Sequence, residues 1–504
     1  MHGRQKKERT AEEEAAKEKE RCKKVAAYRY AMGLILSKRE KKELDEELLK
    51  ITGQVLASNP DISTLWNIRK EVLTVLKETD FTNFSDVVVQ KELDFSEFCL
   101  KSNPKSYGAW HHRVWLMRET NFSKVTSELK LCAKYLEYDD RNFHCWDYRR
   151  YLVENCSEVT LEQEFDFTTE KISSNFSNFS SWHLRSKILP KLPRDFLDEE
   201  LELIRNAVFT DPKDQSAWFY HRWLLRSQLP TESPYLIAAQ YSFTRLILTF
   251  SSKAPTPSQL GVKVVGTDKK IEGIKWTNPW SNTCSKLWEC ELQDENKNIS
   301  VQADSSSMMR NFGNMPLSMK IGDIMRNFPN YFDTETEEKN DKLLNLLKEE
   351  IAWVQELQEL EPDVKWPICT LIMLMRMVDF VGYKQSILTH LDSLMKLDSK
   401  RVNYYLDLRS KYLIEWKLVE CSNTNTHGLD ELLLDLSGLN LTALYYPERM
   451  CFHTKIDLSN NALKNCEPFR ALVNCKELNL SGNELPKSKL KKTIKGLENL
   501  KIEC

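Results

Sequence analysis

A tryptophan recurs at a nearly constant interval through the first half of the chain, and this period constrains the fold more than any other feature. The five members are Trp66, Trp110, Trp146, Trp182 and Trp218. After a first gap of 44 residues, the spacing is 36 residues three times in succession. A fixed period of about 20–50 residues is typical of stacked supersecondary units. We therefore expect a repeated small structural unit and not one closed core.

The intervals between these tryptophans are typical of helices. Apolar residues recur three and four positions apart, and no glycine occurs between Gly108 and Gly261, which suits long helices. A proline lies six residues before Trp66, Trp110 and Trp218, and we expect it at the first position of a helix, after a capping Asn or Asp. Each unit is thus predicted to be a helical hairpin with its Trp early in the second helix. One hairpin cannot cover its apolar face, so neighbours should stack into a curved solenoid.

Most of the tryptophans are followed by an arginine three residues later, on the same helix face. These arginines are Arg69, Arg113, Arg149 and Arg185, while Arg222 comes four residues after the fifth tryptophan. The tryptophans are expected to be core wedges between hairpins. The arginines are expected to reach a carboxylate or a helix C-terminus of the next hairpin. Weaker units around Trp366 and Tyr405 indicate that the solenoid resumes later in the chain.

The segment from about 250 to 340 changes character. Pro, Ser, Thr, Asn and Gly become frequent, and short β-prone pieces alternate. This segment could be a long ordered loop or a small β domain. A stretch of this length with Trp276, Trp280 and Trp288 should have its own hydrophobic core. We predict a small inserted β domain at 246–340.

A second period, of 22 residues, marks the tail. Leu434, Ile456 and Leu478 are equivalent positions, and Asn461 and Asn483 fall where a leucine-rich repeat places its ladder asparagine. The predicted fold is mainly α: a right-handed α-α superhelix with a small β-sandwich-like insertion and a leucine-rich tail. Its predicted divisions are 1–245 and 341–425 for the helical repeats, 246–340 for the insertion and 426–504 for the tail.

Composition excludes several functions. The chain has 72 basic and 74 acidic residues, and a general nucleic-acid binder would show a basic excess. Its 13 cysteines include no CxxC pair, which favours reduced thiols over a disulfide framework or zinc knuckle. No apolar stretch is long enough to span a bilayer. We therefore expect a cytoplasmic protein that does not cross a membrane.

The Pro-x-x-Tyr-x-x-Trp-x-x-Arg type of repeat, over about residues 40–250 and 341–418, resembles the α subunits of protein prenyltransferases. The β insertion, immunoglobulin-like in that family, and the leucine-rich tail resemble the Rab geranylgeranyltransferase members. The farnesyl and type I enzymes carry a Gln, which holds the carboxylate of the substrate's C-terminal box, where this chain has Gly108. Glycine has no side chain for that hydrogen bond, which favours the Rab type.

The resemblance implies a function and a set of partners. The chain would be the α subunit of an obligate heterodimer that transfers geranylgeranyl from geranylgeranyl diphosphate to C-terminal cysteines of Rab proteins presented by an escort protein. The zinc ion and the lipid pocket would belong to the β subunit, so this chain would bind no cofactor alone. Two alternatives stay open: an α subunit of farnesyltransferase or type I geranylgeranyltransferase, and a non-enzymatic TPR-like scaffold, whose period would be 34 residues.

The resemblance also implies site residues. Lys105 aligns with a diphosphate-contacting Lys and precedes a helix N-terminus, which favours anions; a solvated Lys is the alternative. Tyr107 aligns with an active-site Tyr, or it packs beside Trp110. His144 aligns with a His near the diphosphate, or it is structural. His2 aligns with an N-terminal His that can reach the partner's zinc, or it begins a charged helix in solvent.

Overall fold

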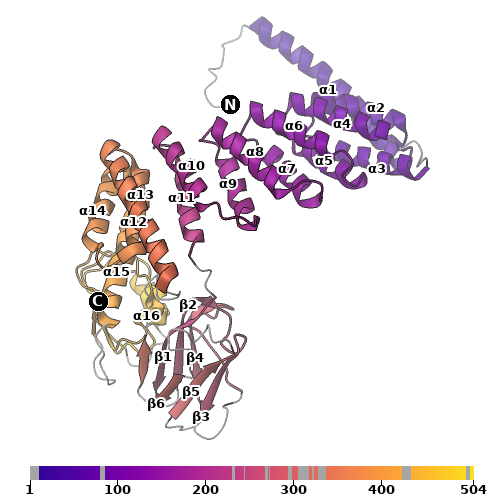
Figure 1. Ribbon diagram of the computed structural model, residues 1–504. Helices are drawn as coiled ribbons and strands as arrows, with labels where there is room; N and C mark the ends of the chain where they lie inside the picture. The colour runs from indigo at the N-terminus through magenta and orange to yellow at the C-terminus, as the bar shows by residue number, and fades with distance from the viewer. Residues whose placement is uncertain are drawn as a thin grey trace. The chain divides into compact units, whose positions relative to one another are not determined.

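The computed structural model describes residues 11–79, 86–229, 233–242, 245–266, 271, 273–292, 298–304, 317–320, 323–326, 337–422, 433–494 and 500–503. The chain divides into two compact units, Met1–Ile204 and Arg205–Cys504, and helices predominate in it (Figure 1). Among the helices in these ranges, none is long and apolar enough to cross a membrane.

The first unit is a series of helical hairpins that follow one another along the chain (Figure 1). Helix α1 (Ala11–Glu40) precedes α2 (Glu46–Ser58) paired with α3 (Ser63–Thr79), α4 (Asp86–Ser102) with α5 (Tyr107–Glu119), α6 (Val125–Tyr138) with α7 (Phe143–Asn155), and α8 (Leu161–Ser174) with α9 (Phe179–Ile188). The 3-10 helix η1 (Leu189–Lys191) and helix α10 (Leu197–Thr210) follow. The prediction of a mainly helical fold built from repeats is confirmed.

Helices α5 and α7, the second helices of their hairpins, each begin directly after a capping side chain. Ser106 caps α5 by accepting a hydrogen bond from the backbone N–H of Ala109, and Asn142 caps α7 by accepting from two backbone N–H groups. These side chains satisfy donors that have no partner inside the helix. Pro104 lies in the turn before Ser106, so the expectation that proline occupies the first helical position is wrong.

The proline position has another role, which involves the tryptophans. Each repeat tryptophan donates its indole N–H to the backbone carbonyl six residues earlier, at distances of 2.8 to 3.0 Å. The acceptors are Pro60, Pro104, Asp140, Phe176 and Pro212. All five rings are buried, and a buried indole N–H needs an acceptor. Each tryptophan therefore ties its helix to the preceding turn as well as filling the core.

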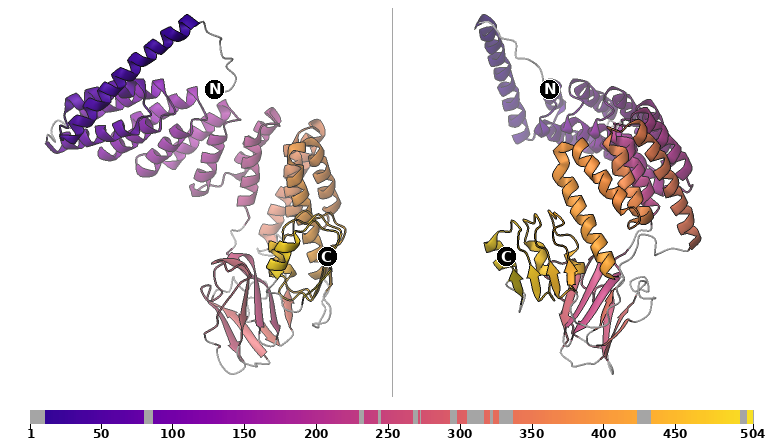
Figure 2. Two further views of the ribbon diagram at one scale, coloured as in Figure 1. Left: turned by 180° about the vertical axis from the view of Figure 1, so that it is seen from behind. Right: turned by 90° about the vertical axis from the view of Figure 1, so that its left-hand side faces the viewer.

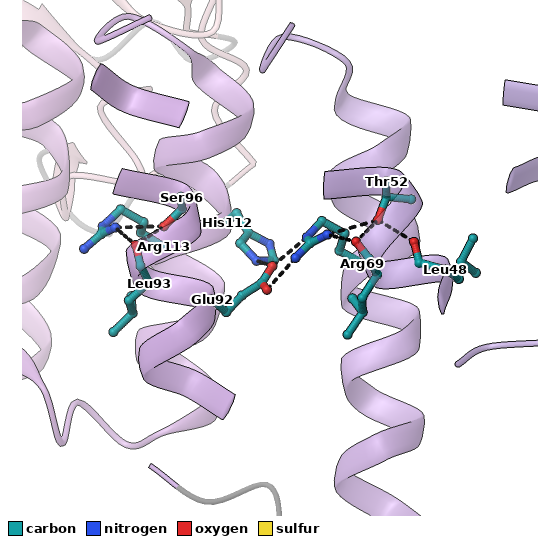
Figure 3. Close-up of polar contacts among 9 residues, drawn as sticks. Leu48, Thr52, Arg69, Glu92, Leu93, Ser96, His112 and Arg113 are labelled. Carbon is teal, nitrogen blue, oxygen red and sulfur yellow. Dashed lines mark hydrogen bonds and ion pairs between the residues drawn. The ribbon is translucent and has the colours of Figure 1, made fainter. Parts of the chain in front are cut away.

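The repeat arginines form buried ion pairs between hairpins. Each guanidinium binds both oxygens of a glutamate on the first helix of the following hairpin, with one N–O distance of 2.6 Å in every pair. The pairs are Arg69 with Glu92, Arg113 with Glu128, Arg149 with Glu164, and Arg185 with Glu200. Arg113 also donates to the carbonyl of Leu93 and the hydroxyl of Ser96 on α4, both at 2.7 Å (Figure 3). One guanidinium thus joins three successive helices.

The fifth repeat uses a histidine in place of the arginine. On α11 (Gln215–Ser227), His221 stands three residues after Trp218, and its Nε2 lies 2.6 Å from Glu350 of α12 (Glu337–Leu360). Arg222 instead donates to the Trp218 carbonyl and lies over the Trp366 ring. The interpretation of Arg222 as the fifth repeat arginine is therefore wrong, because Arg222 lies one position beyond the helix face that points to the next hairpin.

A second histidine joins the first ion pair of the series. His112 is fully buried, and its Nε2 lies 2.9 Å from the Glu92 carboxylate that Arg69 also binds (Figure 3). Burial is the main reason that the pKa of His112 is lowered, with Arg69 and Lys70 adding to it against the opposing effect of Glu92. Burial would raise the pKa of Glu92, but hydrogen bonds from His112 and Arg69 outweigh it and lower this pKa to about 2.

This network predicts that acid destabilises the first unit in two stages. Because the folded-state pKa of His112 is below its unfolded value of about 6.5, the unfolded chain takes up that proton first, and stability falls as the pH drops below about 6.5. The Glu92 contribution is lost later, from about pH 4.3 downward. One such group changes the unfolding free energy by at most about 1.4 kcal/mol per pH unit. Urea unfolding at pH 7.5 and 5.5 should show a smaller pH difference for His112→Gln than for the unaltered protein. An equal difference in both would exclude His112 as the titrating group.

The second unit contains seven described strands between α11 and α12. They are β1 (Leu236–Ser242), β2 (Arg245–Ala254), β3 (Val262–Gly266), β4 (Ser285–Glu291), β5 (Asn298–Ala303), β6 (Leu317–Lys320) and β7 (Ile324–Arg326). They form two antiparallel sheets, in the orders β4-β2-β1-β7 and β3-β5-β6, which share a core around Trp288. Strand β1 begins before residue 246, so the helical segment ends earlier than the predicted boundary at 245.

Helices resume after the strands and lead into a parallel sheet. Helices α12, α13 (Lys365–Asp379), α14 (Lys384–Leu397) and α15 (Val402–Ser422) are followed by β8 (Leu433–Asp435), β9 (Lys455–Asp457), β10 (Glu477–Asn479) and β11 (Lys501–Glu503). These strands are parallel, with Leu434, Ile456 and Leu478 in register. Short helices α16 (Pro447–Met450) and α17 (Lys487–Ile494) lie between strands.

Asparagine side chains and α15 support the parallel sheet. Asn461 donates to the carbonyls of Leu436 and Leu458 at 2.9 Å. Ile414 and Leu418 of α15 share the core of these strands. The tail also contacts strand β2, where Thr249 donates to the carbonyl of Glu448. Figure 2 shows the tail, in yellow, beside the pink inserted strands.

Candidate functional site

Lys105 lies in the turn between α4 and α5, directly before the capping residue Ser106. Its side chain is 64% exposed, and its Nζ lies 3.2 Å from a carboxylate oxygen of Asp139, the residue that ends α6 in the next hairpin. An exposed ammonium at a helix N-terminus adds to the positive potential of the helix dipole. The position therefore suits an anion that approaches from outside this unit.

Tyr107 and His144 come together from consecutive repeats. Tyr107 is the first residue of α5, His144 is the second residue of α7, and their ring centroids are 4.2 Å apart in an edge-on arrangement. Phe143 contacts both rings. Tyr107 and Phe143 are largely exposed, whereas His144 is buried. The predicted residues Tyr107 and His144 thus form one aromatic cluster at the N-terminal ends of two second helices.

His144 is held toward its neutral form. Burial is the main reason that its pKa is lowered, with a further contribution from the charge of Lys105 and an opposing one from Asp147. A neutral imidazole can donate one hydrogen bond and accept another. His144 therefore suits hydrogen bonding to an anion's oxygen better than charge neutralisation, for which the exposed ammonium of Lys105 is better suited.

A cavity of about 400 Å³ opens beside this cluster. Its walls come from the second helices of three consecutive hairpins, α3, α5 and α7. The lining residues are Ser63, Trp66, Asn67, Lys70, Tyr107, Gly108, Trp110, His111, Val114, Phe143, His144, Asp147, Tyr148 and Tyr151. Most of this lining is aromatic or apolar, as in surfaces that receive a partner or ligand.

Gly108 forms part of the cavity floor because no side chain fits there. A Cβ at this position would lie 2.4 Å from Cδ1 and 2.6 Å from Nε1 of the Trp66 indole. That indole is buried and held by its hydrogen bond to Pro60. The absence of a side chain at Gly108 therefore has a packing reason in addition to the substrate-related one inferred from the sequence.

Gly108→Ala should consequently destabilise the first unit by about 1–3 kcal/mol, since overpacking a rigid core forces neighbours to move. Gly33→Ala is the matched control: it also lies in a helix, but a methyl group placed there would have nothing within 4 Å. At Gly33, alanine should stabilise the helix by about 0.5–1 kcal/mol. Chemical unfolding of both variants tests the pair. Equal effects at the two glycines would mean that Trp66 can move aside.

Adjacent histidines on α5 have different surroundings. His112 is buried in the ion-pair network, whereas His111 is exposed and lines the cavity, with its Nδ1 3.3 Å from Nζ of Lys70. In the described part of the chain, no three His, Cys, Asp or Glu side chains group as a metal site. His2, the expected ligand to a partner's zinc, lies outside the described residues.

Sequence reasoning missed the cavity and the Lys70–His111 contact, because both depend on which residues of different hairpins meet. The expectation that the repeat arginines reach a carboxylate of the next hairpin is confirmed, although the glutamates themselves were not identified. One signal was available for the glutamates, because Glu128, Glu164 and Glu200 follow their arginines by the same number of residues. No comparable period marks Lys70.

Comparison with known proteins places the repeats in one class. Four segments match the protein prenyltransferase alpha subunit repeat: residues 89–120, 125–156, 161–192 and 197–228. The matched segments include hairpins that carry a buried Trp and an Arg–Glu pair to the next hairpin, so these hairpins are repeats of the α-subunit class of protein prenyltransferases. The class expected from the sequence is thereby confirmed.

Relatives that align with most of this chain identify its family within that class. The geranylgeranyl transferase type-2 subunit alpha of Rattus norvegicus is 36% identical, covering 99% of this chain and 89% of its own. The Homo sapiens protein of that name is 36% identical over 95% and 86%, and the Dictyostelium discoideum protein is 31% identical over 82% and 100%. This chain therefore belongs to the family of geranylgeranyl transferase type-2 alpha subunits.

Proposed function

We propose that this chain is the α subunit of a heterodimeric Rab geranylgeranyltransferase. With a β subunit, it helps to transfer geranylgeranyl from geranylgeranyl diphosphate to C-terminal cysteines of Rab proteins that an escort protein presents in the cytoplasm. The observation that carries the proposal is that Lys105, Tyr107 and His144 all lie at the N-terminal ends of α5 and α7, in a chain of this family.

Each residue of the cluster has a distinct task in this proposal. The Lys105 ammonium stabilises the negative charge that develops on the departing diphosphate. His144, neutral at physiological pH, hydrogen-bonds a phosphate oxygen, and the Tyr107 hydroxyl is a second donor at the same edge. Phe143 has no hydroxyl, so it supplies only an apolar surface beside them.

Zinc is assigned to the partner in this proposal. A zinc ion lowers the pKa of a substrate thiol and holds the thiolate, and we assign it, together with the lipid pocket, to the β subunit. The exposed Tyr107 and Phe143 beside the cavity support a partner-facing role for this edge, since exposed aromatic groups are enriched at protein interfaces.

The proposal extends to the architecture. We assign the hairpins to a right-handed superhelix, the two antiparallel sheets to an immunoglobulin-like insertion, and the tail to leucine-rich repeats. The 22-residue step between parallel strands and the side-chain hydrogen bonds of Asn461 and Asn483 to strand carbonyls support the last assignment.

Co-expression tests the function directly. The chain is produced with a Rab geranylgeranyltransferase β subunit, and the purified complex is assayed for zinc content and for geranylgeranyl transfer to a Rab protein with and without its escort. We expect a complex with one zinc ion and escort-dependent transfer. Transfer to a C-terminal-box peptide without escort would instead favour a farnesyl or type I α subunit. Failure to bind any prenyltransferase β subunit would favour a scaffold.

A further inference from the structure

Lys70 lacks a counter-charge among the described residues of the first unit. It lies on α3 and lines the cavity, and it is half-buried. Its Nζ contacts His111 Nδ1 at 3.3 Å and lies 6.0 Å from the centre of the Trp115 ring. Wherever the structure describes the chain, no carboxylate forms an ion pair with it. Lys77, further along the same helix, contrasts with it by pairing with Glu119 at 2.8 Å.

Lys70 and Arg118 both place positive charge near His111. Burial lowers the pKa of Lys70. Burial also lowers the pKa of His111, and the charges of Lys70 and Arg118 add to this effect. His111 Nδ1 is then the acceptor from the ammonium, which makes its Nε2–H a further donor. A partly desolvated cation without a carboxylate is unfavourable by itself, and an incoming anion would relieve that cost.

The rest of the cavity is mostly aromatic or apolar and is continuous with an exposed aromatic edge. Its one other charged lining residue, Asp147, pairs with Arg150 on its own helix. Trp66, Trp110 and Tyr148 line it, and Tyr107 and Phe143 extend the lining to the surface. A partner that fits this cavity would therefore offer two side chains: an apolar one that packs against the aromatic wall, and a carboxylate that pairs with Lys70. Aromatic anchors beside one desolvated charge pair are typical of binding hot spots between proteins.

We propose that Lys70 and His111 bind an Asp or Glu side chain of the β subunit, while a neighbouring apolar side chain of that subunit fills the cavity between α3, α5 and α7. This inference rests on the proposed function, because it takes the edge marked by Tyr107 as the partner-facing one. Lys70 is then a determinant of heterodimer assembly, not a catalytic residue.

The test measures assembly of the full chain with its β subunit at low and high salt. Lys70→Met should weaken assembly about tenfold or more and flatten its salt dependence, because truncating one member of a desolvated interfacial pair raises the dissociation rate. Lys70→Arg keeps the charge and should retain most of the affinity. Lys77→Met removes a lysine from the same helix and should change assembly little. Thermal unfolding of each free chain checks that all variants fold alike.

Charge reversal identifies the partner group. Lys70→Glu should weaken assembly further, and one Asp→Lys or Glu→Lys change on the β subunit should restore it. Unchanged affinity and salt dependence for Lys70→Met relative to Lys77→Met would overturn this inference while transfer activity left the proposed function standing. Slower transfer with unchanged assembly would assign the cavity to the substrate and would also overturn it. Failure of the unaltered chain to bind any β subunit would instead sink the proposed function.

Discussion

Lys105→Ala is expected to slow geranylgeranyl transfer by about 10²–10³-fold without weakening the heterodimer. Removing one charge contact that strengthens in the transition state typically has an effect of this size. The exposed ammonium has Asp139 as its partner in the described part of the chain, 3.2 Å away. Without Lys105, this carboxylate stays at the edge where the proposed function places the departing diphosphate, so its repulsion should add to the lost attraction. Single-turnover rates with saturating Rab–escort complex measure the effect on the chemical step.

Two variants control for the Lys105 result. Lys101 is also a paired, exposed lysine, with a 63% exposed side chain and Glu97 at 3.4 Å, and Lys101→Ala should leave the rate unchanged. Asp139→Asn removes the repulsive carboxylate and should keep the rate within about a few-fold of normal. A normal single-turnover rate for Lys105→Ala would remove Lys105 from the site.

The period of the tryptophans predicted most of the helical architecture. The 36-residue step located the second helices, since a Trp in the early turns of each is buried in the same way. It did not reveal what the prolines do: Pro104 supplies a carbonyl to Trp110, and the helix begins later, at Tyr107, after the cap Ser106. A proline that starts a helix and a proline whose carbonyl accepts a hydrogen bond give the same sequence pattern. Only the structure distinguishes these two roles.

The residues of the candidate site were also only partly predictable from the sequence. Lys105, Tyr107 and His144 were found through resemblance, and the sequence period explains why His144 meets Tyr107 from the next repeat. No sequence pattern identifies Lys70. What distinguishes it is that no carboxylate among the described residues pairs with it, and this depends on how three helices pack. At the fifth repeat, the sequence did not show that His221, and not Arg222 beside it, takes the place of the repeat arginine. A one-residue shift changes the helix face by about 100°, and that decides which side chain meets Glu350.

Arg113→Met should destabilise the first unit by about 3–5 kcal/mol. It leaves the buried Glu128 carboxylate with Tyr148 as a remaining donor, at 2.7 Å, and breaking a buried ion pair from one side costs about this much. It also leaves the Leu93 carbonyl without its side-chain donor. Changing both partners, as Arg113→Met with Glu128→Leu, should recover much of the loss, because a well-packed apolar pair can replace a buried ion pair.

The ion pair between Arg39 and Glu71 is a control that distinguishes the effect of burial on stability from the effect of hydrogen-bond geometry. Arg39 binds both carboxylate oxygens of Glu71, at 2.9 and 2.6 Å, as Arg113 does those of Glu128 at 2.8 and 2.6 Å. The first pair is 44% and 38% exposed, and the second is 1% and 4% exposed. Arg39→Met should therefore change the unfolding free energy by less than about 1 kcal/mol. Urea unfolding of both variants measures the contrast. Similar losses for the two arginines would show that hydrogen-bond geometry, and not the burial of the glutamate, determines how strongly the hairpins are joined.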